Sequence, residues 1–388
     1  MRVLHVITDL DSGGAEMQLC ALCALLKGAG YDQKVVVLKA EGLLSPRIRA
    51  LGVDCIHLDL ATGRLDLGGG RALRTIVQEY QPVVVHTWMY HACVYAALAG
   101  LSGRPLLLSV HHSSLSFAND SVSTLIAAFA CGVLSYRRNV HLAYCAESAR
   151  RSHEERGYCR ERGVFIPNGY ANSRFQRNLQ SGEAMRAKLE IRADAIVFGL
   201  VARFNPIKDH TTFLKAFSIV REHHPEAVAL LAGNDIDSSN AGLLRLISRW
   251  CPDRSAVVLA GRCNDMVAAF SAMDVLVLSS RSEAFPNVLC EGMLCELPCV
   301  TTDVGDCTSI VGDCGIVVAP GSADLLGAAM RRIFELPHAD RVAMGLNGRR
   351  RIAARYPEDK LLRSYAASYE NCRLRLRTAE DSHRRSDQ

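Results

Sequence analysis

The chain opens with Met1-Arg-Val-Leu-His-Val-Ile-Thr8, continues through Asp11-Ser-Gly-Gly-Ala-Glu16 and enters the apolar run Met17–Leu26. Val3–Ile7 is rich in apolar and β-branched residues on both faces, as in a strand buried within a parallel sheet. The two glycines allow a tight turn, and the run that follows them is typical of a core helix. We therefore predict a strand–loop–helix unit at the start of the chain.

The same unit recurs along the sequence, because short Val-, Ile- and Leu-rich runs alternate with stretches of helical period. We expect strands at residues 3–7, 34–38, 55–58, 83–86, 106–110, 140–144 and 164–166, and again at 196–201, 227–231, 256–260, 275–278, 299–301 and 315–317. This alternation predicts an α/β fold of two Rossmann-like, doubly wound parallel-sheet domains. Such sheets bind ligands at the carboxyl ends of their strands, so we expect the chemistry in a cleft that the two domains face.

A polar stretch at residues 172–182 separates the two halves. We expect an N-terminal domain at residues 1–175 and a C-terminal domain at residues 185–355. Residues 356–377 have a helical pattern and are expected to pack back toward the N-terminal domain, and the polar residues 378–388 are expected to form a disordered tail.

The net charge of the chain argues against one class of protein. A net charge of +5 on 388 residues is mild and argues against a dedicated nucleic-acid binder. The basic excess lies in the first half of the chain, which indicates either an anionic ligand or surface on that side or scatter between two ordinary domains.

The 15 cysteines are odd in number and lie mostly in apolar runs, as small hydrophobic side chains do. Cys20 and Cys23 form a C-x-x-C pair, but no second pair stands at zinc spacing, so a metal or redox role is the weaker reading. Met1 leads directly into a strand, and the longest uncharged apolar run, Leu125–Leu134, is shorter than the roughly 20 residues of a membrane span. We expect a cytoplasmic, reduced protein without a signal peptide or spanning helix.

Two loops of the second half carry charged residues directly after strands. In Val201-Ala-Arg-Phe-Asn-Pro-Ile-Lys-Asp209, Arg203 and Lys208 combine an arginine fork with a lysine point charge, which suits a diphosphate. The alternative is two solvated cations near a helix start, where the helix dipole does not favour them.

The second loop is Ser282-Glu-Ala-Phe-Pro-Asn-Val-Leu-Cys-Glu-Gly-Met293. Pro286 suits the first turn of a helix, so the amides of Asn287 and Val288 would point free N–H groups at an anion. Glu283 in the loop and Glu291 in the helix can hold sugar hydroxyls on either side of a phosphate. In the alternative, Glu291 is an ordinary surface residue.

Motifs in this order along the chain resemble the retaining glycosyltransferases of family 4, which have the GT-B fold and include enzymes of bacterial surface polysaccharide biosynthesis. They are Gly13-Gly14-Ala-Glu16, Ile166-Pro-Asn-Gly169 with Phe175, the pair Arg203 and Lys208, and the carboxylates Glu283 and Glu291 eight residues apart. The glycine turns at 302–306 and 311–315 are similar as well. The likeness extends over nearly the whole chain. Pro286 departs from it, because that family often has glycine there and proline removes one amide donor.

The resemblance implies a role for each matching residue. Arg203 and Lys208 would neutralise the donor pyrophosphate as it leaves, Glu283 would hold the donor sugar, and Glu291 the ribose. His111 would lie near the reacting centre; the sequence does not separate it from His112, although the spacing from the strand favours His111. The remaining positions expected to bind substrate are Gly13, Gly14, Glu16, Asn168, Arg262, Asn287 and Val288.

The resemblance also implies the partners. The donor would be a nucleotide-diphosphate sugar, with UDP the commonest in the family, and the acceptor a glycan or a polyprenyl-linked sugar bound by the N-terminal domain. No metal or other cofactor is expected, because the two cations replace it. The arginines of residues 137–162 follow the apolar run Leu125–Leu134, which suits peripheral contact with the inner membrane; a core helix beside a solvated basic face is the alternative.

Three other classes fit less well. A nucleotide-sugar epimerase or dehydrogenase needs a glycine fingerprint that Ser12-Gly-Gly-Ala15 does not supply. A GT-B phosphorylase needs a pyridoxal lysine, which nothing here marks. The presence of Arg203, Lys208, Glu283 and Glu291 argues against a catalytically degenerate scaffold, whereas binding of a nucleotide sugar without turnover on any acceptor would support a non-enzymatic nucleotide-sugar binding protein.

Overall fold

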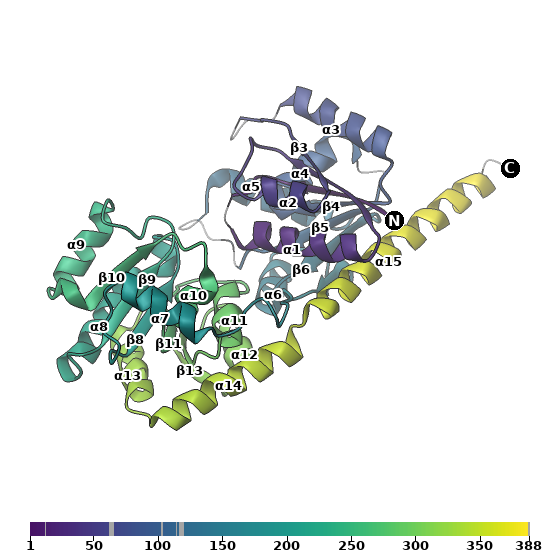
Figure 1. Cartoon of the computed structure of the whole chain (residues 1–388). Helices are drawn as coiled ribbons and strands as arrows, with labels where there is room; N and C mark the ends of the chain where they lie inside the picture. The colour runs from purple at the N-terminus through teal and green to yellow at the C-terminus, as the bar shows by residue number, and fades with distance from the viewer. Residues whose placement is uncertain (12, 62–65, 102–103, 114, 116–119, 387–388) are drawn as a thin grey trace. The chain divides into compact units, whose positions relative to one another are not determined.

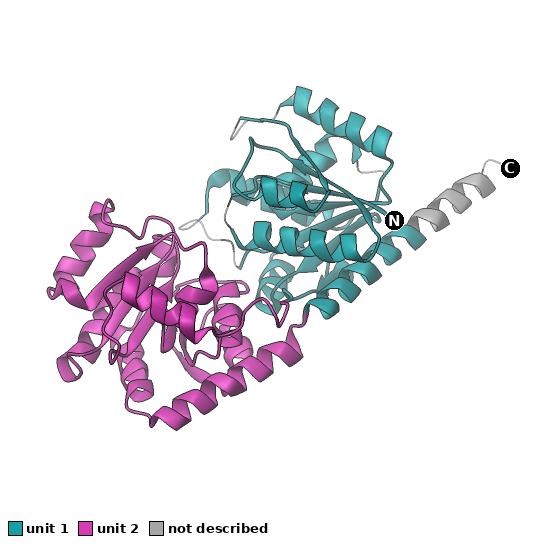
Figure 2. Cartoon of the chain, viewed as in Figure 1, with its two compact units in different colours: residues 1–169, 358–388 teal, residues 170–357 magenta. Residues whose placement is uncertain are grey.

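The computed structural model describes residues 1–11, 13–61, 66–101, 104–113, 115 and 120–386. The chain forms two compact units, one comprising Met1–Gly169 and the segment from Glu358 onward, the other Tyr170–Pro357 (Figure 2). The first unit thus ends at Gly169 rather than at residue 175. A Cβ atom on Gly169 would lie 2.7 Å from Cβ of Leu361, so glycine lets the outgoing chain pass close to the returning one.

The first unit is a seven-stranded parallel sheet of order β3-β2-β1-β4-β5-β6-β7; Figure 1 labels β3, β4, β5 and β6 of this sheet. Its strands are β1 (Arg2–Ile7), β2 (Asp32–Val37), β3 (Asp54–His57), β4 (Val84–Trp88), β5 (Leu106–Val110), β6 (Val140–Tyr144) and β7 (Gly163–Phe165). Its helices are α1 (Gly14–Gly28), α2 (Ser45–Ala50), α3 (Leu67–Tyr80), α4 (Met89–Leu98), α5 (Val122–Leu134), α6 (Glu147–Glu155) and α15 (Glu358–Ser386).

Helices cover both faces of this sheet, as the sequence predicts for strands apolar on both sides. Val3 and Ile7 of β1 pack in one core cluster with α1 and α15, whereas Leu4 and Val6 pack in another with α3 and α4. This alternation follows from the two-residue period of a strand. The fold is therefore doubly wound.

The second unit is a six-stranded parallel sheet of order β10-β9-β8-β11-β12-β13. Its strands are β8 (Val197–Val201), β9 (Val228–Ala232), β10 (Val257–Gly261), β11 (Val275–Leu278), β12 (Cys299–Thr302) and β13 (Gly315–Val318). Its helices are α7 (Leu179–Lys188), α8 (His210–His223), α9 (Ala241–Trp250), α10 (Met266–Ser271), α11 (Asn287–Leu294), α12 (Cys307–Val311), α13 (Ala323–Phe334) and α14 (His338–Arg355).

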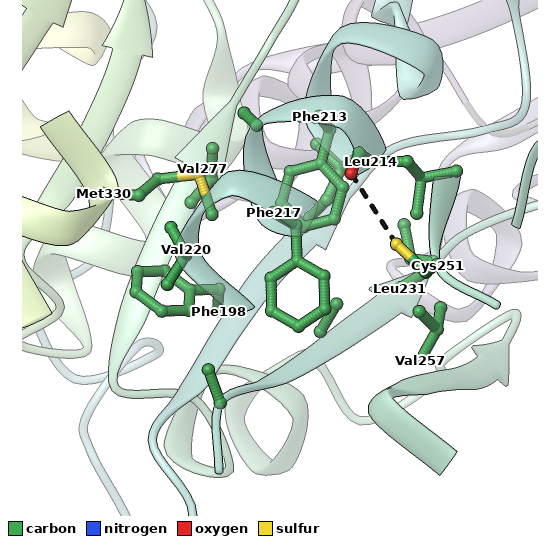
Figure 3. Close-up of a cluster of buried hydrophobic side chains, with 14 of the residues drawn as sticks. Phe198, Phe213, Leu214, Phe217, Val220, Leu231, Cys251, Val257, Val277 and Met330 are labelled. Carbon is green, nitrogen blue, oxygen red and sulfur yellow. Dashed lines mark hydrogen bonds between the residues drawn. The ribbon is translucent and has the colours of Figure 1, made fainter. Parts of the chain in front are cut away.

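Three phenylalanines lie within the largely aliphatic core of the second unit. Phe213 and Phe217, one helical turn apart on α8, stack with ring centroids 6.3 Å apart, and Phe217 also meets Phe198 of β8 edge to face (Figure 3). The thiol of Cys251 closes the same cluster and donates to the carbonyl of Leu214 at 3.6 Å. The thiol thus fills apolar space, as expected of a reduced, buried cysteine.

Helix α15 continues to Ser386, and residues 387 and 388 lie outside the described part of the chain; the disordered tail expected from residue 378 stays a prediction. Residues 378–386 contain no glycine or proline that would stop the helix. Within the described residues, no helix combines the length and apolar character needed to cross a bilayer.

Candidate active site

The strand order of the second unit reverses between β8 and β11, which are paired neighbours although nearly 80 residues apart in sequence. This reversal is the topological switch point at which doubly wound sheets bind ligands. The loops that leave the carboxyl ends of these two strands carry Arg203, Lys208 and Glu283. Two loops distant in sequence thus supply one candidate site.

Lys208 and Glu283 are in direct contact across this point. Lys208 Nζ donates to Glu283 Oε1 at 2.5 Å, and the two side chains are 24% and 11% exposed. A partly buried charge pair holds both groups in one geometry, and neither charge is left unpaired. The Lys208 side chain therefore has a fixed orientation, and it stays exposed enough to contact a ligand.

The Glu283 loop is fixed by its neighbours. Ser280 Oγ donates to the same Glu283 oxygen at 2.6 Å, and Thr302 Oγ1 donates to the carbonyl of Ser280 at 2.6 Å. Gly305 has φ of 58°, and a Cβ atom there would lie 2.2 Å from the carbonyl oxygen of Glu283. Only glycine permits this approach, so the 302–306 turn supports the carboxylate.

The Lys208 loop has its own anchor, Asp209, which caps helix α8 in a left-handed conformation with φ of 48°. Its buried carboxylate accepts from Thr212 Oγ1 and from Arg281 Nε, both at 2.7 Å. Ser279 Oγ donates to the carbonyl of Lys208 at 2.9 Å. These contacts tie the β8 and β11 loops to each other beside the Lys208–Glu283 pair.

Arg203 differs from Lys208, because its side chain is exposed and has no hydrogen bond or ion pair within the described residues. Its backbone is nevertheless fixed, since the next residue, Phe204, donates its amide to the carbonyl of Asn234 at 2.9 Å. The guanidinium is thus a free cation on a rigid loop, at the same edge of the sheet as Lys208.

Helix α11 begins at Asn287, as predicted, with Pro286 as its N-cap and no side chain capping its first amides. The first amides of a helix have no partner within the helix, so those of Asn287 and Val288 can serve an anion. The side chain of Asn287 accepts from Tyr170 Oη at 2.5 Å.

Glu291 lies one turn further along α11 and is partly buried. Burial raises the pKa of Glu291 to about 7, although Arg174 opposes the shift. The carboxyl is therefore not the ordinary surface residue of the alternative reading. A carboxylate held in an apolar setting gains from hydroxyl donors when it ionises.

In the first unit, His111 follows β5 directly and stacks on Trp88 of β4, with ring centroids 5.2 Å apart and planes at 20°. Its backbone amide donates to the sulfur of Met89 at 3.3 Å. Burial lowers the pKa of His111 to about 4, so the imidazole is neutral at pH 7. Its Nε2 is buried and has no partner within the described residues.

His112 has a different environment, because its Nε2 lies 2.9 Å from Asp120 Oδ1. Its ring lies 5.9 Å from that of Tyr90, which packs in a core cluster separate from that of Trp88. Each histidine has one buried ring nitrogen without a partner within the described residues, Nε2 of His111 and Nδ1 of His112, but His111 stacks on Trp88 whereas His112 pairs with Asp120.

The other predicted positions are more scattered. Gly13 and Gly14 begin α1, and the carboxylate of Glu16 folds back over Gly13, where a Cβ atom would lie 2.2 Å from Glu16 Oε2. Asn168 is buried just before the chain leaves the first unit, and Arg262 is exposed after the edge strand β10, two strands from β8.

Sequence reasoning missed the groups that hold the predicted residues in place: Ser279, Ser280, Asp209 and Trp88. The serines had a signal, since a polar pair directly after the apolar strand Val275–Leu278 stands at a carboxyl end. Trp88 had none, because a tryptophan in an apolar run indicates core. Among the described side chains, no three of His, Cys, Asp and Glu gather as a metal ion would require.

Two family models match the chain. The model described as glycosyltransferase family 4 matches residues 12–174, and the model described as glycosyl transferases group 1 matches residues 195–335. The first match falls within the first unit apart from its last five residues, and the second lies wholly within the second unit.

Three curated proteins are similar to the chain. The putative glycosyltransferase EpsF of Bacillus subtilis is 26% identical over 78% of this chain and 79% of its own length. The capsular polysaccharide biosynthesis glycosyltransferase CapM of Staphylococcus aureus is 25% identical over half of each chain. The UDP-Gal:alpha-D-GlcNAc-diphosphoundecaprenol alpha-1,3-galactosyltransferase of Escherichia coli is 27% identical over 36% of each.

Among solved structures, Anabaena HepE in complex with UDP and glucose superposes with a TM-score of 0.84 at 20% identity, covering 96% of this chain and all of that one. At this identity the likeness shows the fold alone, and that fold is GT-B. The family matches, the curated relatives and the two parallel sheets agree with the resemblance seen in the sequence. The chain is a GT-B glycosyltransferase, composed of a family 4 domain followed by a group 1 domain.

Proposed function

We propose that this glycosyltransferase moves a sugar from a nucleotide-diphosphate sugar, with UDP as the nucleotide, to a glycan or lipid-linked acceptor with retention of anomeric configuration. The observation that carries the proposal is the Lys208–Glu283 contact at the switch point between β8 and β11. It joins a cation suited to a diphosphate and a carboxylate suited to sugar hydroxyls in one site.

The donor site is built from the second unit. Lys208 and the free guanidinium of Arg203 bind the pyrophosphate, and the amides of Asn287 and Val288 add donors to it. Glu283 turns from Lys208 toward hydroxyls of the sugar, and Glu291 accepts from the ribose.

In the reaction, the bond between the anomeric carbon and the phosphate oxygen breaks, and a bond from the acceptor oxygen forms on the same face. The acceptor proton passes to the departing phosphate. Arg203 and Lys208 stabilise the charge that develops on that phosphate, which is electrostatic catalysis of leaving-group departure. His111, neutral at pH 7, orients the sugar or acceptor through Nε2, which has no partner within the described residues.

The names of similar proteins support these choices. HepE was solved with UDP and glucose, and the name of the E. coli relative gives UDP-Gal and a diphosphoundecaprenol-linked sugar as donor and acceptor. CapM takes part in capsular polysaccharide biosynthesis. We therefore place this chain in surface polysaccharide assembly, at the cytoplasmic side of the membrane.

A thermal-shift panel of nucleotide sugars tests the donor assignment, since a ligand that binds only the folded protein raises its melting temperature. We expect a UDP-sugar to stabilise the wild type and to stabilise Lys208→Ala much less. If a sugar linked to another nucleotide stabilised the protein instead, the proposal of UDP as the donor nucleotide would be wrong. Binding without transfer to any acceptor would favour a non-catalytic sugar-nucleotide binding protein.

A second part of the proposal is contact with the membrane through helix α5. One face of α5 is buried through Ala127, Ala128, Cys131 and Gly132. The other exposes Val122, Ile126, Phe129 and Val133, which are 62–75% accessible and recur at helical spacing. The apolar run Leu125–Leu134 is thus both a core helix and an exposed apolar stripe.

Basic side chains stand at the end of this stripe. Arg137 and Arg138 follow α5 and are exposed, and Arg162 donates to the carbonyl of Arg137 at 2.7 Å, which brings residues 160–162 to the same place. Arg160 is 72% exposed. Apolar side chains beside clustered arginines match an anionic lipid surface better than a neutral partner.

Flotation with vesicles of phosphatidylcholine, with or without phosphatidylglycerol, tests this contact. We expect binding only with the anionic lipid and its loss in Phe129→Ser. The control is Leu179→Ser, which changes an equally exposed apolar residue on α7 of the second unit. A dimer in solution that Phe129→Ser dissociates, without vesicle binding by the wild type, would assign the stripe to a second copy instead.

A further inference from the structure

Helix α15 brings two tyrosines into the core of the first unit, next to the stack that carries His111. Tyr369 Oη lies 2.8 Å from Nδ1 of His86, and Tyr365 Oη lies 3.0 Å from Oγ of Ser109. His86 Nε2 and Ser109 Oγ are 2.7 Å apart. Four buried groups from β4, β5 and α15 thus form one continuous hydrogen-bonded chain.

These four hydrogen-bonded groups act as a unit, because His86 cannot donate from both ring nitrogens. Burial lowers the pKa of His86 well below its usual value and keeps the ring neutral. A neutral imidazole donates from one nitrogen and accepts at the other. The bonds on either side of His86 therefore run in the same direction, and loss of one tyrosine hydroxyl disturbs the other end.

His86 is also the first ring of a stack that ends at His111. Its ring centroid lies 4.6 Å from that of Trp88 with the planes at 30°, and Trp88 in turn stacks on His111. Trp88 is fully buried, and its Nε1 donates to Nδ1 of His5 at 3.3 Å. Because His111 Nε2 has no partner within the described residues, the face of Trp88 decides how the His111 ring lies.

We infer that Tyr365 and Tyr369 of the C-terminal helix are positioning residues for His111, acting through the His86–Ser109 pair and Trp88. The inference rests on the proposed function, because it takes His111 as the residue that meets the substrates. It gives helix α15 a part in the reaction, in addition to its part in the core.

The double variant Tyr365→Phe/Tyr369→Phe removes both hydroxyls and keeps both rings. We expect kcat to fall about tenfold while the KM for the donor stays within about twofold, since misplacing a reacting group costs turnover more than binding. The matched control is Tyr158→Phe, which loses an equally buried hydroxyl, bonded to the carbonyl of Ala128 at 2.6 Å, in another core cluster of the same unit. It should keep kcat.

A spectroscopic measurement separates positioning from general destabilisation. The chain has two tryptophans, so Trp250→Phe leaves Trp88 as the sole fluorophore. In that background we expect the tyrosine double variant to red-shift Trp88 emission and Tyr158→Phe to leave it unchanged. If the tyrosine double variant kept the kcat and the Trp88 emission of the wild type while His111→Ala lost turnover, the inference about the tyrosines would be overturned and the proposed role of His111 would stand. Normal turnover in His111→Ala would overturn the proposed role of His111 first.

Discussion

The two units place their candidate residues by opposite means. In the second unit, charge holds charge: Lys208 contacts Glu283, and Arg281 contacts Asp209. In the first unit, a neutral histidine is held by ring stacking on Trp88, with a buried polar chain behind it. The difference fits the function that we propose, in which the second unit binds a pyrophosphate, which needs charge, and His111 meets a neutral hydroxyl, which needs an oriented, uncharged partner.

The strongest test of this difference between the units removes the ion pair between Lys208 and Glu283. We expect Lys208→Ala and Glu283→Ala each to lower kcat by about a hundredfold or more, the range found for removing a preorganised electrostatic contact. Steady-state transfer assays check this, with circular dichroism to show that the variants fold. Lys34→Ala, which removes an exposed ion pair with Asp54 in the first unit, is the control. Near-normal turnover in both site variants would reject the assignment.

The two adjacent histidines test the first unit. We expect His111→Ala to lose about tenfold or more in kcat, because the open imidazole on Trp88 orients a reacting group. His112→Ala should mainly lower the melting temperature, since it removes the 2.9 Å contact between His112 Nε2 and Asp120 Oδ1. Parallel kinetics and melting curves distinguish the two. If the residues exchanged these effects, the stack would not be the site.

A smaller effect concerns pH and Glu291. Its pKa is raised to about 7 in the free protein, so the carboxyl is protonated below that pH and ionised above it. Ribose hydroxyls donate to the ionised form, so donor affinity should weaken as pH falls below 7, by at most about tenfold per pH unit. Calorimetric titration of a UDP-sugar at pH 6 and pH 8 measures this. The Glu291→Gln variant should bind the UDP-sugar more weakly and with an affinity that does not depend on pH. A pH dependence equal to that of the wild type would contradict this prediction.

The smallest expected effect is that of a chelator. Because we propose that Arg203 and Lys208 provide the positive charge at the pyrophosphate, we expect EDTA to leave turnover within about twofold. Loss of activity with EDTA that manganese restores would show that the second unit needs more charge than its side chains supply.

Much of this architecture could be predicted from the sequence. Each predicted strand overlaps an observed one, and 106–110, 140–144 and 275–278 agree to the residue, because strands buried on both faces leave an unbroken apolar signal. The helix start at Asn287 followed from Pro286. The chain's exit from the first unit at Gly169 did not, because it depends on a contact with Leu361, far away in sequence.

The candidate site was partly predictable for the same reason. Charged residues directly after strands, such as Lys208 and Glu283, are visible as motifs, but their 2.5 Å contact depends on β8 and β11 being neighbours in the sheet. The distinction between His111 and His112 depends on which face of β5 each side chain follows and on Trp88 being there to meet it. No local pattern contains that information.

The division of the first unit between the two ends of the chain also affects its synthesis. The second unit is continuous from Tyr170 to Pro357 and is complete before the final helix leaves the ribosome. The first unit begins earlier in the sequence, but its core is completed later. The last side chains of that core come from helix α15: Leu361, Tyr365, Tyr369 and Cys372. Since domains generally fold as units during translation, the N-terminal sheet must wait with part of its core uncovered. A nascent chain halted before residue 358 should thus expose that apolar face to chaperones, although its second unit is already whole.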